Sequence, residues 1–198
     1  GGVASSPAVA RFPSLGNGLG APHRLGRALL LQPTQDLGLA LALNAFTPLR
    51  LCRAVLPSML ARDAGAIVNV SSTAAFAPVA GMSYYAASKA ALAAAHDALR
   101  GELSKSGVHL LLVYPGPIRT ALGNACEARY QPDLGTRLQR WGEADVLADR
   151  TLAAVDRRAR HLVYPALYDA ARRFPGLTRR ATEALAPSVR APAGAPKG

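Results

Sequence analysis

Apolar residues return at helical spacing in the first strongly patterned stretch of the chain. From Leu37 to Leu56 they recur every three to four residues, and Thr34 stands just before this pattern. Such a period places the apolar side chains on one face, so we expect a long helix that begins near Thr34. Pro48 and Pro57 lie inside it, and because proline lacks the amide hydrogen that a helix interior needs, they should bend or interrupt the helix.

Three short apolar runs predict strands that alternate with helices. Ala66–Val70 and Val108–Val113 are continuous runs of the kind found in strands buried on both faces, and His161–Tyr164 is a shorter third run. An Ala-rich stretch that ends at Gly107 predicts a helix between the first two strands, and Glu143–Arg158 predicts another before the third. Residues 121–142 show only a weak pattern.

The alternation of strands and helices predicts an α/β fold, a three-layer domain with a parallel sheet and right-handed crossovers. We divide the chain into an irregular N-terminal segment (1–33), the part of the domain that carries the candidate site (34–165), and a basic C-terminal helix with a disordered tail (166–198). Ligands of such sheets bind beyond the carboxyl ends of the strands. Candidate chemistry is therefore expected just after residues 70 and 113.

Composition and charge narrow the functional classes. Half of the 198 residues are apolar, which suits one domain with a buried core. The formal net charge of +11 is uneven, since nine basic and two acidic residues follow from Arg157 onward, and this argues against nucleic-acid binding by the whole domain. The apolar stretches fall short of a membrane span and the N-terminus lacks a signal-peptide layout, so we expect a cytoplasmic protein.

Cysteine and histidine spacing predicts no metal site. Cys52 and Cys126 are 74 positions apart, without a CxxC motif, and the four histidines show no HExxH spacing. A disulfide scaffold and a structural zinc site are both disfavoured, and a reducing compartment fits.

The basic C-terminal segment has two interpretations. Two pairs of arginines enclose two apolar residues, a pattern typical of a helix that contacts an anionic membrane surface. The arginines are Arg172, Arg173, Arg179 and Arg180, and the apolar residues are Phe174 and Leu177. The same pattern also describes a solvated helix that covers the domain, which is the favoured interpretation.

Tyr85 and Lys89 form a YxxxK pair on the Ala-rich helix, where a spacing of four places both side chains on one face. A free tyrosine titrates near pH 10, and a neighbouring ammonium group favours its phenolate form. Lowering the pKa by ~2 units would require roughly 3 kcal/mol of differential interaction. Taken alone, the pair is equally compatible with an ordinary solvated helix face.

Other polar residues are ambiguous one at a time. Ser72 ends the first predicted strand, where a hydroxyl group either reaches a substrate or caps the next turn. Asn44 stands inside the first helix, an unfavourable place for asparagine that indicates a specific hydrogen bond or else a kink. Pro115 and Gly116 follow the second strand and by themselves indicate only a turn.

Taken together, four segments resemble the short-chain dehydrogenase/reductase family. They are LALNAFTPLRLCRAVLPSM with Asn44, then IVNVSS with Ser72, then YYAASKAAL with Tyr85 and Lys89, then VYPGPIRTAL. The resemblance runs from about Leu37 to Leu122, and the order and spacing agree with the family's Asn–Ser–Tyr–Lys tetrad and Pro-Gly turn.

The resemblance implies an NAD- or NADP-dependent oxidoreductase that transfers hydride between nicotinamide and a carbonyl compound or secondary alcohol. Tyr85 would be the acid–base group, Lys89 would lower its pKa and hold the nicotinamide ribose, and Ser72 would polarise the substrate oxygen. Asn44 would position a water molecule that links Lys89 to solvent. The cofactor's carboxamide end would meet the backbone from Pro115 through Gly116 to Ile118, and Thr120.

The resemblance also implies partners. In many relatives the helices equivalent to those bearing Asn44 and Tyr85 form a dimer interface, so we expect a homo-oligomer. Residues 121–142 would cover a small-molecule substrate, and their larger apolar residues favour an apolar one: Leu122, Tyr130, Leu134, Leu138 and Trp141.

The phosphate-binding part of the family pattern is not found in this sequence. The string GNGLGA (Gly16–Ala21) satisfies GxGxxG/A, yet no strand precedes it and no helix start follows, so we interpret it as a loop. We therefore expect a Rossmann-like domain that lacks its N-terminal strands. A non-catalytic fragment or pseudoenzyme, at most an interaction module, remains the alternative function.

Overall fold

The computed structural model describes residues 37–180 except 129, 133, 175, 177 and 179. The predicted irregular segment 1–33, the GNGLGA string within it, and the predicted disordered tail therefore lie outside the described residues. So do residues 181–184 of the predicted basic helix.

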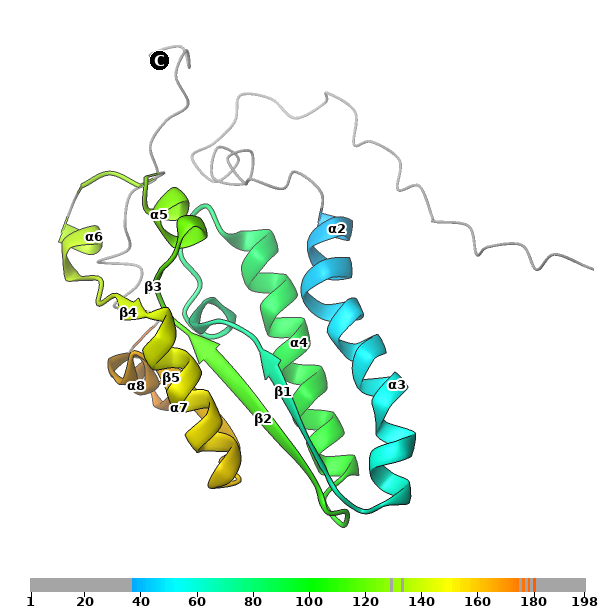
Figure 1. Ribbon diagram of the computed structural model, residues 1–198. Coiled ribbons are helices and arrows are strands. Elements are labelled where there is room, and N and C mark those ends of the chain that lie inside the picture. Colours follow the sequence, from blue (N-terminus) through cyan, green and yellow to red (C-terminus); the bar gives the residue numbers. More distant parts are fainter. Residues whose placement is uncertain are drawn as a thin grey trace, which may run out of the picture.

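Three parallel strands form the main sheet, with β2 (Val108–Pro115) between β1 (Gly65–Val70) and β5 (His161–Tyr164) (Figure 1). In the register, Gly65 lies opposite Val108, and Leu112 lies opposite His161. All three predicted strands are confirmed. The strands are parallel because helices connect them, and each crossover returns the chain to the end of the sheet at which the previous strand began.

Helices cover both faces of the sheet, which confirms the three-layer α/β fold. Alternate residues of β2 point to opposite sides. Leu110 packs with Cys52 of α3 (Thr47–Ala61), beside Leu99 of α4 (Ser83–Glu102), whereas Leu111 packs with Ala154 of α7 (Ala144–Asp156). Figure 1 shows α3 and α4 together on one side of the strands and α7 on the other. The continuous apolar run of β2 thus reflects burial on both faces.

The first predicted helix is present, and its interruption is a widened turn. α2 (Leu37–Leu41), η1 (Ala42–Phe46) and α3 follow one another without a gap, and η1 has π-helical geometry. Pro48 lies in the first turn of α3, where the missing amide hydrogen is tolerated, and the π-helical turn directly precedes it. Pro57 lies inside α3.

This helix corrects one expectation about membrane spans. By length and composition alone, the 25 residues Leu37–Ala61 are apolar enough to cross a membrane, and 17% of their most apolar window is buried. In the fold the helix packs against α4 and β1, through the side that carries Asn44 and Cys52. Its other side remains exposed.

The expected helix stop at Gly107 is wrong, because α4 ends at Glu102. Gly107 lies in the turn before β2, where its amide donates to the Asp63 carboxylate. A Cβ atom at this position would come 1.9 Å from the Asp63 carbonyl oxygen. The close approach of two backbone segments, rather than helix termination, requires glycine here.

The weakly patterned stretch after β2 folds into short elements. β3 (Ile118–Arg119) pairs in parallel with β4 (Gly142–Glu143), and between them lie α5 (Ala121–Glu127) and α6 (Leu134–Leu138).

After β5 come η3 (Ala166–Tyr168) and α8 (Asp169–Arg173). The basic segment expected to form one helix over 166–184 is divided in its described part: α8 ends at Arg173, Phe174 is not helical, and the described residues 176, 178 and 180 are helical again. Arg172 and Arg173 both pair with Asp169 across one helical turn, which stabilises this short helix.

Candidate active site

The carboxyl ends of β1 and β2 bring together residues far apart in sequence. Ser71 continues the strand ladder by donating its amide to the Val113 carbonyl, at 2.8 Å. Ser72 follows, and its hydroxyl donates to the Pro115 carbonyl at 3.4 Å. The end of the first strand therefore lies against the Pro-Gly turn that ends the second.

Ser72 also caps the short helix η2 (Thr73–Ala75). Its Oγ accepts the Ala74 amide at 3.2 Å, so the capping interpretation of this serine is correct. The same hydroxyl forms a hydrogen bond with the Tyr85 side chain. A serine fixed by its backbone and its cap thus presents its hydroxyl to the phenol.

Tyr85 lies in the first turn of α4 and is half-buried. Burial raises its pKa above the ordinary 10.0, because a phenolate loses solvation there. The hydrogen bond with Ser72 acts in the opposite direction, and Cys126 on α5 adds to the increase. Sequence reasoning missed Cys126 as a neighbour, since α5 is brought to Tyr85 only by the fold.

Lys89 lies one turn further along α4, as the YxxxK spacing predicts. Its Nζ donates to the Val70 carbonyl at 2.9 Å and lies 5.8 Å from the centroid of the Tyr85 ring. Burial lowers the pKa of Lys89. The expectation that Lys89 lowers the pKa of Tyr85 is not met in this arrangement, because desolvation of the phenol dominates.

Asn44 makes a specific hydrogen bond, as its place inside a helix suggested. Its Nδ2 donates to Ser88 Oγ at 3.1 Å, and Ser88 Oγ donates to the Tyr85 carbonyl at 2.8 Å. Ser71 Oγ in turn donates to the Lys89 carbonyl at 2.9 Å. These contacts join η1 and the end of β1 to the turn of α4 between Tyr85 and Lys89.

Of the two serines in these contacts, Ser71 belongs to the pair with Ser72 that was expected to follow the first strand, whereas Ser88 was missed by the sequence analysis. Ser88 is completely buried and Ser71 nearly so. Ser88 directly precedes Lys89, but serine is too common in helices for its position alone to have identified it.

The Pro-Gly turn after β2 also has structural contacts of its own. The Gly116 amide donates to the Tyr164 carbonyl at 2.7 Å, and a Cβ at Gly116 would lie 2.9 Å from the Tyr168 ring. Ile118 pairs with Gly142 in the small sheet. Thr120 caps α5, where its Oγ1 accepts the Gly123 amide at 3.0 Å.

Residues 121–142, which were expected to cover the substrate, pack only in part against the rest of the domain. Tyr130 is buried and its hydroxyl donates to the Ala80 carbonyl at 2.9 Å, which ties the 121–142 segment to the loop before α4. Leu134 and Leu138 are exposed, and Trp141 lies beneath the Arg119 guanidinium, 4.3 Å from it. The side chain of Leu122 lies outside the described residues.

The donor set fits the nicotinamide–ribose half of a dinucleotide. Lys89 has three ammonium hydrogens and gives one to Val70, so two remain for ribose hydroxyls. The hydroxyl groups of Tyr85 and Ser72 hydrogen-bond each other beside it. Within the described ranges no glycine-rich phosphate loop is present, and no group of three or more His, Cys, Asp or Glu could hold a metal ion.

The comparisons with known proteins agree with this geometry. A family model described as short chain dehydrogenase matches residues 15–131. The oxidoreductase claN of Passalora fulva is 45% identical over 82 residues, which are 41% of this chain and 38% of that protein. An uncharacterised oxidoreductase of Myxococcus xanthus is 39% identical over 129 residues, covering 61% of this chain and 50% of the relative.

Among solved structures, a short-chain dehydrogenase from Sphingobium yanoikuyae in complex with NADPH superimposes with a TM-score of 0.60 at 31% identity. The match covers 85% of this chain and 62% of that one. The chain thus spans less than two thirds of the length of these relatives.

Proposed function

Since the chain belongs to the short-chain dehydrogenase family, we propose that it serves hydride transfer between NAD or NADP and a small carbonyl compound or its secondary alcohol. The observation that carries this proposal is the hydrogen bond between Ser72 and Tyr85, with Lys89 one helical turn away. Two hydroxyl groups at one point, on rigid elements, are what a carbonyl oxygen requires as it gains negative charge.

In this proposal Tyr85 donates its phenolic proton to the substrate oxygen during reduction. Its raised pKa keeps the phenol protonated at neutral pH, which is the form that can donate. Ser72 hydrogen-bonds the same oxygen and fixes its position. Bound NAD(P)H supplies the hydride to the carbonyl carbon.

Lys89 would hold the cofactor by its two remaining ammonium hydrogens, directed at ribose hydroxyls. Asn44 acts as a positioning residue: through Ser88 it fixes the turn of α4 that carries both Tyr85 and Lys89. A water molecule between Asn44 and Lys89 would give Lys89 a path for protons to solvent.

The test is spectrophotometric NAD(P)H oxidation with a panel of ketones. Tyr85→Phe removes the acid and should lower kcat about 100-fold or more, while leaving cofactor affinity nearly unchanged. Tyr84→Phe, one residue away, is the matched control and should retain activity. Equal rates for Tyr85→Phe and the unmodified chain would reject the assignment.

A non-catalytic interaction module is the second candidate, because the described residues hold only one end of a dinucleotide site. Titration of NADH and NADPH against the full chain separates the two functions. Saturable binding at micromolar concentration supports the oxidoreductase, whereas its absence, together with partner binding, supports the interaction module.

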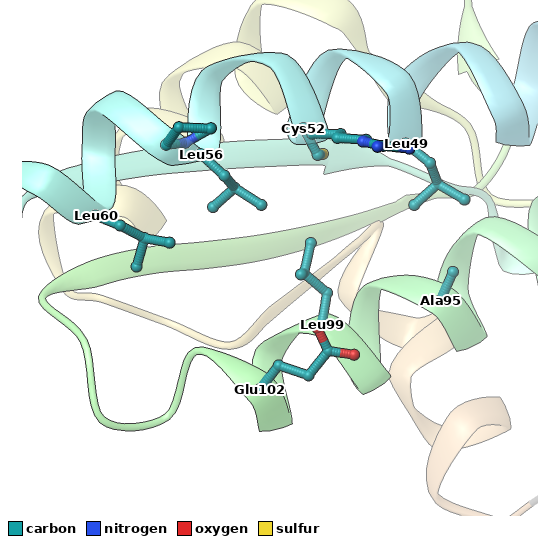
Figure 2. A pocket seen from close by; sticks show the side chains of 9 residues that line it. Leu49, Cys52, Leu56, Leu60, Ala95, Leu99 and Glu102 are labelled. Atoms are coloured by element: carbon teal, nitrogen blue, oxygen red, sulfur yellow. The ribbon is translucent and has the colours of Figure 1, made fainter.

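Self-association suits either function. Large apolar side chains are exposed along the helix from α2 to α3: Leu39, Leu43, Phe46, Leu51, Val55 and Leu60. Beside them, α3 and α4 enclose a groove of about 380 Å³, which Leu56, Leu60 and Leu99 line (Figure 2). We propose that a second copy covers this surface, since contiguous exposed apolar area of this kind marks interfaces.

Light scattering after gel filtration tests the dimer. Leu43→Lys with Leu51→Lys should yield monomers, because buried charges would oppose association. Leu152→Lys introduces the same charge at an equally exposed leucine on α7 and should leave the dimer intact. A monomeric unmodified chain would contradict the proposal.

A further inference from the structure

A second hollow lies at the end of the sheet opposite Tyr85. Its volume is about 250 Å³, and it is lined where α4 ends, where β2 begins and where the chain turns from α7 into β5. The basic residues of its lining come from all three places: Arg100, His109, Arg158 and Arg160. No acidic residue is among the lining side chains, all of which belong to the described part of the chain.

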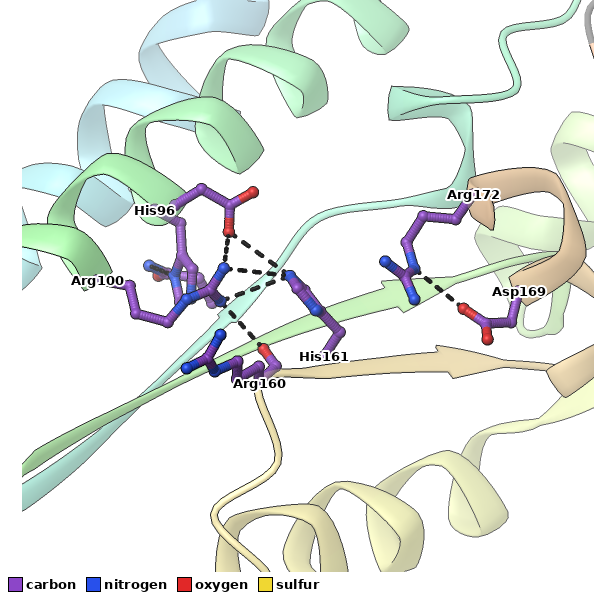
Figure 3. Close-up of polar contacts among 8 residues, drawn as sticks. His96, Arg100, Arg160, His161, Asp169 and Arg172 are labelled. Carbon is purple, nitrogen blue, oxygen red and sulfur yellow. Dashed lines mark hydrogen bonds and ion pairs between the residues drawn. The ribbon is translucent and has the colours of Figure 1, made fainter. Parts of the chain in front are cut away.

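The three arginines differ in how much of their hydrogen-bonding capacity is used. Arg100 pairs with Asp97 and also approaches His161 and the Arg160 carbonyl, each at 3.4 Å (Figure 3). Arg158 donates one hydrogen bond, to the Gly107 carbonyl at 3.1 Å. The Arg160 guanidinium has no hydrogen bond or ion pair to the residues that the structure describes. Each guanidinium has five donors, so most of those on Arg158 and Arg160 remain free.

The backbone of Arg158 is held in an unusual conformation. Its φ is +51°, in the left-handed region that residues other than glycine seldom adopt. This conformation, in the short turn between α7 and β5, goes with the hydrogen bond that its guanidinium makes to Gly107. The turn therefore holds Arg158 against the start of β2, where it lines the hollow beside His109.

His109 lines the hollow together with these arginines. It is 7% exposed, lines the hollow, and its Nε2 has no hydrogen-bond partner within the described ranges. A buried polar atom without a partner destabilises the fold, because it loses its hydrogen bonds to water and gains none in return. Burial and the nearby Arg158 both lower the pKa of His109, whereas a hydrogen bond with the Ala159 backbone raises it. A negative charge in the hollow would oppose the effect of the arginines.

We propose that this hollow binds a small oxyanion of the phosphate type, either free or as a phosphate monoester. Guanidinium groups match the oxygens of such an anion, since each can donate two parallel hydrogen bonds. The site is separate from the proposed dinucleotide site, because the two lie beyond opposite ends of β2.

The test is calorimetric titration of the full chain with inorganic phosphate at constant ionic strength. Saturable binding of one equivalent is expected. Arg160→Gln should weaken it about tenfold or more, since a charge-assisted hydrogen bond is lost. Arg160 has no side-chain partner among the described residues, so this change should leave the fold intact. Arg157→Gln, an exposed neighbour outside the lining, removes the same charge and should leave affinity unchanged.

Two further measurements complete the test. A comparison of ligands identifies the source of the phosphate group, and the resonances of His109 give a readout that nonspecific attraction between charges would not produce. Glycerol phosphate that binds more tightly than inorganic phosphate indicates a phosphorylated metabolite, whereas the reverse order indicates the free ion. In both cases the imidazole nitrogen resonances of His109 should shift on binding. Absence of saturable binding, equal weakening by Arg157→Gln and Arg160→Gln, or equal binding of acetate would overturn the proposal.

Discussion

The buried imidazole of His96 should make stability depend on pH in the range from neutral to weakly acidic. His96 is completely buried in α4, and its Nδ1 lies 3.0 Å from Asn69 Nδ2. Burial, together with the positive charge of Arg100, lowers the pKa of His96 from 6.5 to about 4. Because the Asn69 amide can donate only to an unprotonated nitrogen, the folded state holds this ring neutral.

The sign and size of the effect follow from proton linkage. The unfolded chain binds a proton at His96 near pH 6.5, whereas the folded chain resists it until about pH 4. Stability is therefore retained above the unfolded pKa and lost as the pH falls. With these two pKa values, the free energy of unfolding should fall by about 2 kcal/mol between about pH 7 and about pH 5 from this group alone.

Urea unfolding at a series of pH values measures this loss. His96→Gln removes the titrating group and keeps an acceptor for Asn69. Over the same pH range, its free energy of unfolding should therefore fall by about 2 kcal/mol less than that of the unmodified chain. The pKa values of His109 and His161 are also lowered, chiefly by burial, so the unmodified chain loses stability at these sites as well. Comparison with the variant isolates His96.

Parallel pH profiles for the unmodified chain and His96→Gln would refute the reasoning. His161→Gln serves as the control, because His161 lies partly exposed beside Asp97, whose charge favours its protonated form. That variant should change the pH profile less than His96→Gln does.

Three further predictions concern packing and the site. Ser88→Ala should lower the free energy of unfolding by about 1 to 2 kcal/mol, measured by urea titration, because Ser88 is buried and its loss leaves the Asn44 amide unpaired. Gly107→Ala should lower the free energy of unfolding by about 2 kcal/mol or more, since a Cβ would meet the neighbouring backbone at 1.9 Å. Gly101 lies inside α4 with open space around it, so Gly101→Ala should raise the free energy of unfolding by about 1 kcal/mol. If Tyr85 is the proton donor, the rate of ketone reduction should stay level through neutral pH and fall only above about pH 10, because the pKa of Tyr85 is raised; a fall near neutral pH would contradict this.

Local patterns predicted the elements and part of the site. The apolar runs gave the three main strands, since the central strand of a parallel sheet is buried on both faces and its sequence shows no alternation. The spacing of Tyr85 and Lys89 placed both on one face of α4, because helix geometry fixes which residues are neighbours. The short elements of residues 121–142 were not predicted, as segments this short depend on their tertiary contacts.

The sequence by itself determined the order of strands and helices, and the family to which these motifs belong. Only the tertiary structure decided which groups meet: Ser72 with Tyr85, Asn44 with Ser88, and the arginines around His109. It also decided the direction of each pKa shift, raising that of Tyr85 where the YxxxK spacing had suggested a decrease. The physical reason is that hydrogen-bonding periodicity is local, whereas desolvation depends on every segment that packs around a group.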